Sequence, residues 1–172
     1  AMPWVRCSGN DMAELTKLLD MGAYGVICPM IETVEQARQL VSATRYAPLG
    51  RRSFGPARGL LYGGSDYLAH ANEEVLVLAM IETQDGLKNA EDILQVPGLD
   101  GIYIGPNDLA LSLGISPATP WQESVLADHI HDLSLIHISE PTRPLYISHA
   151  VFCLKKDACF TRIDVTRRQS PG

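Results

Sequence analysis

The stretch YGVICPM, residues 24–30, is apolar almost throughout and indicates the fold class. The preceding segment carries Met12, Leu15, Leu18 and Leu19 at helical spacing, which gives one apolar face. A second helical segment follows over residues 33–41. A strand that lies between helices and is apolar on both faces is typical of a parallel sheet. The stretch therefore predicts an α/β protein.

Signals for helix ends support these two helices. Asn10-Asp11 can cap the first helix, and Gly22 suits its C-terminus. Thr33 and Gln36 have the spacing of a capping box for the second helix.

The same alternation runs through the first two-thirds of the chain. Further strands are predicted at residues 3–7, 75–81 and 101–105, further helices at 66–74, 84–94 and 107–113, and a Gly/Arg/Pro-rich loop at 46–64. Four strand–helix units imply right-handed crossovers, as in a doubly wound sheet or part of a (β/α)8 barrel. A closed barrel needs about 250 residues. The pattern alone leaves a half-barrel and a small open sheet both possible.

Composition excludes several classes of function. The 172 residues carry a net charge of −6, so no electrostatic argument supports binding to nucleic acid or an anionic membrane. We find no apolar run of membrane-spanning length and no signal peptide at the start of the sequence. The four cysteines show no metal-type spacing, and we expect a reduced, cytoplasmic protein.

The alternation stops after about residue 131. Residues 133–156, LSLIHISEPTRPLYISHAVFCLKK, resemble the translation of a sequencing adapter. We therefore expect a partial barrel domain over residues 1–132 and an artefactual tail with no domain over 133–172. On this interpretation His137, His149, Cys153 and Cys159 belong to no functional site.

Two carboxylates follow consecutive predicted strands. Glu82 comes directly after the third strand, and Asp108 comes just after the fourth. Sequential parallel strands are often neighbours about 4.8 Å apart, so the two side chains can share one divalent ion. The alternative for each is a role at a helix N-terminus, where a carboxylate complements the dipole.

Three other features have both structural and functional interpretations. Arg6, after the first strand, can clamp a carboxylate or form an ordinary salt bridge. Arg51, Arg52 and Arg58 belong to a loop that can hold an anion, form a subunit contact, or simply be solvated. His70 lies in the middle of a predicted helix, so we interpret it as a surface or interface residue.

Several motifs resemble one known family. VRCSGND, GAYGVICPMIETVEQARQLVSATRYAPLGRRSFGP, MIET and GIYIGPNDLALSLG are similar to the class II pyruvate aldolases that act on 4-hydroxy-2-oxoheptanedioate and 2-keto-3-deoxy sugar acids. The wider group includes the citrate lyase β-subunit. The resemblance runs from about residue 3 to 114, and it implies a (β/α)8 barrel, here about four βα units of one.

The resemblance also implies a site. Glu82 and Asp108 correspond to the ligands of a Mg²⁺, Mn²⁺ or Co²⁺ ion, and Arg6 to the arginine that binds the pyruvate carboxylate and carbonyl. The backbone of Asn107 and Asp108 corresponds to a further holder of that carboxylate. The implied reaction cleaves a 4-hydroxy-2-oxo acid to a 2-oxo acid and an aldehyde through a metal-stabilised enolate. The resemblance also implies that the full-length enzyme is a homo-oligomer, usually a hexamer.

The chain departs from the family's pattern in one respect. The family's catalytic histidine precedes the first residue here, so we expect this chain to be at best a weak metal binder and inactive. Two alternatives stay open: a citrate-lyase-type subunit that acts on a thioester, and a truncated chain with no catalytic role.

Overall fold

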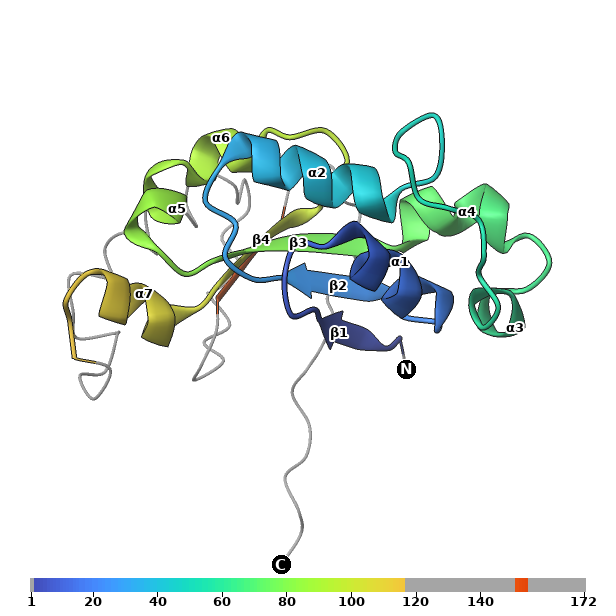
Figure 1. The fold of residues 1–172 in the computed structure, drawn as a ribbon, viewed down its shortest axis with the longest axis horizontal. Coiled ribbons are helices and arrows are strands. Elements are labelled where there is room, and N and C mark those ends of the chain that lie inside the picture. Colours follow the sequence, from blue (N-terminus) through green and yellow to red (C-terminus); the bar gives the residue numbers. More distant parts are fainter. Residues whose placement is uncertain (1, 117–150, 155–172) are drawn as a thin grey trace, which may run out of the picture.

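The computed structural model describes residues 2–116 and the backbone strand at residues 151–154. Their strands form one sheet in the order β1-β2-β3-β4-β5. The first four are parallel neighbours in chain order: β1 (Trp4–Arg6), β2 (Gly25–Cys28), β3 (Leu76–Ile81) and β4 (Gly101–Ile104). The fifth strand, β5 (Val151–Leu154), pairs antiparallel with β4 (Figure 1).

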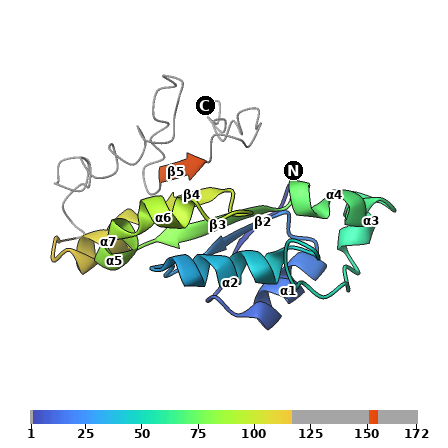
Figure 2. The same cartoon turned by 90° about the horizontal axis from the view of Figure 1, so that it is seen from above.

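Helices cover one face of this sheet. The main ones are α1 (Met12–Asp20), α2 (Val34–Thr44), α5 (Gln84–Lys88) and α6 (Ala90–Leu94). Figure 2 shows the sheet nearly edge-on with α1 and α2 on the same side. Their apolar faces form one buried core with alternate residues of the strands, such as Val77, Ala79 and Ile81 of β3. None of the helices within residues 2–116 is long and apolar enough to cross a membrane.

The remaining helices mark the two ends of the sheet. Helix α7 (Pro106–Ser112) follows the carboxyl end of β4. Helices α3 (Gly59–Gly63) and α4 (Tyr67–Glu74) lie at the opposite end, before β3 begins (Figure 1).

The second face of the sheet carries the alternate residues. Val5 packs against the helix-covered core, so Arg6 projects from the other face. The strand register places Arg6 opposite Ile27 and, one strand further, Leu78. Tyr103 is in register with Met80, two residues before Glu82. Arg6 and Tyr103 therefore lie on the face without helices, close to the carboxyl ends of the strands. Parallel α/β proteins have their functional sites at these ends.

The predicted parallel α/β fold and its four strand–helix units are confirmed. The helix signals are confirmed as well: the Asp11 side chain accepts a hydrogen bond from the Glu14 amide at 2.8 Å, and Thr33 forms the capping box with Gln36. Gly22, with a φ of 99°, ends the first helix in the left-handed conformation that glycine favours.

Two predictions of helix boundaries were wrong. The single helix expected over residues 84–94 is divided at Asn89, which serves as the C-cap of α5 and the N-cap of α6. The Asn89 side chain donates to the Glu32 carbonyl at 2.8 Å, a tertiary contact that sequence periodicity does not encode. The loop expected over 46–64 contains the short helix α3. Strand β5 falls in the segment predicted to hold no domain, and the domain division at residue 132 stays a prediction.

Candidate metal and carboxylate site

Glu82 is the central residue of the candidate site. It follows the last residue of β3, and its side chain is only 2% exposed. The Met30 amide donates to Glu82 Oε2 at 3.0 Å, and an Arg6 guanidinium nitrogen lies 3.6 Å from Oε1. Burial raises the pKa of the Glu82 carboxyl; the Met30 hydrogen bond lowers it, the charge of Asp108 raises it and Arg6 lowers it. This carboxylate therefore gains from any further positive charge nearby.

Asp108 reaches the same place from the next strand. It lies in the first turn of α7, where its negative charge raises the pKa of the Glu82 carboxyl. Gly105, which caps α7, allows this approach: a Cβ at Gly105 would lie 2.9 Å from Cγ and 3.2 Å from Oε1 of Glu82. The structure thus places Arg6 and Asp108 near Glu82 at the carboxyl ends of the strands, and the metal- and substrate-binding roles of these residues stay predictions. Asn107 is exposed beside Asp108, in the same first turn.

Tyr103 is a member of this site that the sequence analysis missed. Burial raises the pKa of its phenol, the nearby Arg6 charge lowers it and Glu82 raises it. Both charged groups therefore lie near the Tyr103 ring. The alternation of β4 provides a signal that could have found it, since Tyr103 points to the same face as Arg6 and Met80.

The donor atoms fit a hard divalent cation. Mg²⁺ and Mn²⁺ favour carboxylate oxygens and retain water or substrate in several coordination positions. Among residues 2–116 no group of three or more His, Cys, Asp or Glu side chains is placed to hold a metal. A buried carboxylate next to a second negative charge is unfavourable without a cation. Glu82 and Asp108 are therefore the candidate cation ligands in the described part of the chain.

The arginine-containing loop has a different role from the site. Arg52 is buried, and it donates to Asp20 Oδ1 at 2.9 Å and to the Tyr67 hydroxyl at 3.1 Å. Its guanidinium carbon lies 4.5 Å from the centre of the Tyr46 ring. Arg52 therefore neither binds an anionic ligand, forms a subunit contact nor is solvated. It is an internal structural residue.

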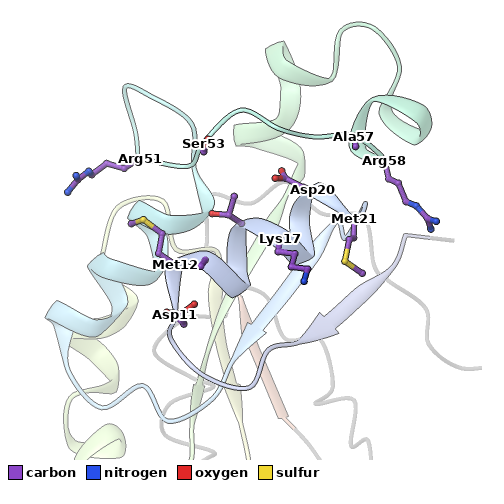
Figure 3. Close-up of a pocket in the computed structure, with 11 residues that line it drawn as sticks. Asp11, Met12, Lys17, Asp20, Met21, Arg51, Ser53, Ala57 and Arg58 are labelled. Carbon is purple, nitrogen blue, oxygen red and sulfur yellow. The ribbon is translucent and has the colours of Figure 1, made fainter.

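Arg51 and Arg58 are exposed and line a hollow of about 780 Å³ between α1 and residues 51–58 (Figure 3). Lys17 and Asp20 of α1 also line it, but Asp20 is already paired with Arg52. The hollow contains neither Glu82 nor Asp108. We place the candidate site at the strand ends because the buried, charge-perturbed carboxylate is there.

The structure shows the positions of one histidine and two cysteines. His70 is 53% exposed and lies 3.8 Å from Asp66, which confirms its surface position. Cys7 and Cys28 are free and buried. His137, His149 and Cys159, and the side chain of Cys153, lie outside the described part of the chain.

Comparison with known proteins gives a consistent result. The model of the family described as HpcH/HpaI aldolase/citrate lyase matches residues 1–131. A hydroxypyruvate/pyruvate aldolase from Rhizorhabdus wittichii is 45% identical over 153 residues, which cover 89% of this chain and 59% of the relative. A 2-keto-3-deoxy-L-rhamnonate aldolase from Salmonella gallinarum is 45% identical over 117 residues, which cover 66% of this chain and 44% of the relative.

A solved structure shares the same architecture. It is described as an HpcH/HpaI aldolase/citrate lyase family protein from Burkholderia cenocepacia, and it aligns with a TM-score of 0.68 and 31% identity over 77% of this chain and 53% of that one. The chain thus spans about half the length of the relatives to which it is similar.

Proposed function

Because this chain belongs to the HpcH/HpaI aldolase/citrate lyase family, we propose that it is part of a divalent-metal-dependent pyruvate aldolase. Such an enzyme cleaves a 4-hydroxy-2-oxo acid to pyruvate, or a related 2-oxo acid, and an aldehyde. The observation that carries the proposal is the buried Glu82 carboxylate, held between the Met30 amide and the Arg6 guanidinium beside Asp108. The names of the two aldolase relatives support the reaction class.

In this proposal Glu82 and Asp108 hold the cation, which can be Mg²⁺, Mn²⁺ or Co²⁺. When bound, such an ion supplies positive charge that stabilises an enolate. Arg6, which is 58% exposed at the end of β1, is the proposed donor to a substrate carboxylate or carbonyl oxygen. The backbone at Asn107 and Asp108, at the start of α7, is a further proposed contact for the substrate carboxylate.

Proton transfer has no assigned residue in the described part of the chain. His70 is the only histidine within residues 2–116, and it lies on α4 at the other end of the sheet. We propose that residues 2–116 bind substrate and stabilise developing charge, and that this chain alone catalyses the cleavage weakly or not at all.

The proposal extends to partners and setting. The ligands are a small 2-oxo acid and an aldehyde, and the parent enzyme is a homo-oligomer, as in the hexameric proteins that the sequence resembles. The free, buried thiols of Cys7 and Cys28 suit a reducing compartment such as the cytoplasm.

The test is whether pyruvate binding depends on the metal and on Arg6. Pyruvate is titrated into the full chain by calorimetry with and without saturating Mn²⁺. We expect binding only with Mn²⁺, and a loss of at least about tenfold in pyruvate affinity for Arg6→Met. Arg38→Met, which removes an exposed arginine of α2, is the matched control. Absence of pyruvate binding to the Mn²⁺-loaded wild-type chain would contradict the proposed function.

A further inference from the structure

Met30, between β2 and α2, has an unusual backbone conformation. Its φ is 57°, and it is the one non-glycine residue with positive φ in the part of the chain that the structure describes. Residues with a Cβ avoid this region because the Cβ approaches the neighbouring carbonyl oxygen. Such conformations persist where the surroundings hold them, and they cluster at functional sites.

Packing of the Met30 side chain does not account for this conformation. The residue is 52% exposed, so little apolar burial is gained by placing its side chain there. The Ile31 side chain, fully buried in the core, anchors the loop after Met30, and Met30 itself is held through its main chain. The Met30 amide donates to Glu82 Oε2 at 3.0 Å, and the next amide, of Ile31, donates to the Met80 carbonyl at 3.1 Å.

These contacts leave the two oxygens of Glu82 in different situations. Oε2 accepts the hydrogen bond from Met30, while Oε1 is the atom that faces the Arg6 guanidinium at 3.6 Å. A carboxylate with one oxygen tied to the main chain has a fixed orientation. Groups that orient ligand side chains in this way raise the affinity of a metal site.

We propose that Met30 is a positioning residue for Glu82, and that its left-handed backbone directs the amide at Oε2 so that Oε1 is presented to the ligand. This inference rests on the proposed function only in naming that ligand as a divalent cation. The positioning itself concerns two groups of this chain, and it can be tested without metal.

Two substitutions separate the backbone from the side chain. Met30→Gly removes the side chain but keeps the amide and readily adopts positive φ. Met30→Val also keeps an amide, but its β-branched side chain opposes this conformation and moves the donor away from Oε2. Met21→Val is the matched control, since Met21 is 56% exposed at the end of α1 with a φ of −77°.

The first measurement is the proton shift and hydrogen-exchange rate of the residue-30 amide in the metal-free full chain. We expect the wild-type and Met30→Gly amides to be protected. Glu82→Leu, which removes the acceptor, and Met30→Val should each shift that resonance and accelerate its exchange by at least about tenfold. If Glu82→Leu leaves the Met30 amide unchanged, the two groups are not coupled and the inference is overturned.

The second measurement is the Mn²⁺ dissociation constant, well below the unfolding temperature of each variant. Met30→Val should weaken Mn²⁺ binding about tenfold or more. Met30→Gly should keep the Mn²⁺ affinity within about threefold of wild type. A lower unfolding temperature with unchanged Mn²⁺ affinity in Met30→Val would show a purely structural role and overturn the inference. If wild-type protein binds no Mn²⁺, the proposed function fails, and the amide measurement still decides whether Met30 positions Glu82.

Discussion

Two arginine–carboxylate pairs lie at opposite ends of the parallel sheet and differ in almost every respect. At the amino ends of the strands, Arg45 is 2.6 Å from Asp100, and the arginine side chain is only 2% exposed. At the carboxyl ends, Arg6 is 3.6 Å from Glu82, and here the arginine is 58% exposed while the carboxylate is 2% exposed. One pair buries its cation and the other its anion.

The amino-end pair is extensively hydrogen-bonded. Arg45 also donates to the carbonyls of Val75 and Gly98, which precede β3 and β4. Asp100 Oδ2 accepts the Val77 amide at 2.7 Å as well as the arginine. The pair joins the starts of two neighbouring strands, and this role is structural.

The buried charge of the carboxyl-end pair is compensated by fewer close hydrogen bonds and ion pairs. Glu82 is buried, burial raises its pKa, and a second carboxylate lies beside it. Its arginine partner is distant and solvated, so the attraction that Arg6 provides is screened. The two ends of the sheet thus differ: the amino end carries a closely paired, buried arginine, and the carboxyl end carries a buried carboxylate that would gain from a nearby cation.

The largest effect we expect is on stability, from Arg45→Met. This change removes the cation but leaves Asp100 and two strand-end carbonyls without it, and losing one partner of a buried pair costs about 3–5 kcal/mol. Urea unfolding measures the loss. Arg38→Met is the control, because Arg38 and its partner Glu35 are 64% and 67% exposed, and such pairs contribute about 0.5 kcal/mol. Equal losses in the two variants would remove the contrast between the ends of the sheet.

A smaller effect, at the carboxyl end, is expected from Gly105→Ala. The new Cβ would lie 2.7 Å from Met80 Cε and 2.9 Å from Glu82 Cγ, so side chains must shift at a cost of about 1–3 kcal/mol. We expect Mn²⁺ affinity to fall as well, because Glu82 itself is displaced. Gly9→Ala is the control, since its Cβ would meet nothing within 4 Å. Unchanged Mn²⁺ binding in Gly105→Ala would show that the position of Glu82 is not critical.

The sequence alone predicted the parallel sheet and the positions of two carboxylates. The apolar strands at 24–30 and 75–81 predicted a parallel sheet, because burial on both faces leaves a pattern in composition. Glu82 and Asp108 could be placed because Glu82 follows one strand directly and Asp108 lies in the short segment after the next strand. These inferences depend on local order, which the sequence displays.

Other features depend on contacts between distant segments. The conformation of Met30 is associated with a carboxylate 52 residues away, and the buried Arg52, in a loop, pairs with Asp20 at the end of α1. The break at Asn89 likewise accompanies a contact with Glu32. Nothing in the local composition distinguishes Arg52 from the exposed Arg51 beside it.

The smallest effect concerns Tyr46, which follows Arg45 at the amino end. Its hydroxyl is buried with no hydrogen-bond partner in the described part of the chain, and burial raises its pKa to about 12. The folded chain then keeps this proton where the unfolded chain loses it. Tyr46 therefore makes stability fall as pH rises from about 10 to 12.

Tyr46→Phe should remove that alkaline dependence and change stability at neutral pH by no more than about 1 kcal/mol, in the stabilising direction. Urea unfolding at several pH values measures both effects. Tyr62→Phe is the control, since Tyr62 is 70% exposed. A Tyr46→Phe variant that keeps the full wild-type slope above pH 10 would contradict the assignment.

In the proposed function, the carboxyl end of the sheet binds a divalent cation through Glu82 and Asp108. The direct measurement is calorimetric titration of the full chain with Mn²⁺, for wild type, Glu82→Gln and the exposed control Glu73→Gln. We predict a single site in wild type and Glu73→Gln, with affinity reduced by at least about a hundredfold in Glu82→Gln. Equal Mn²⁺ affinity in all three proteins would contradict the account.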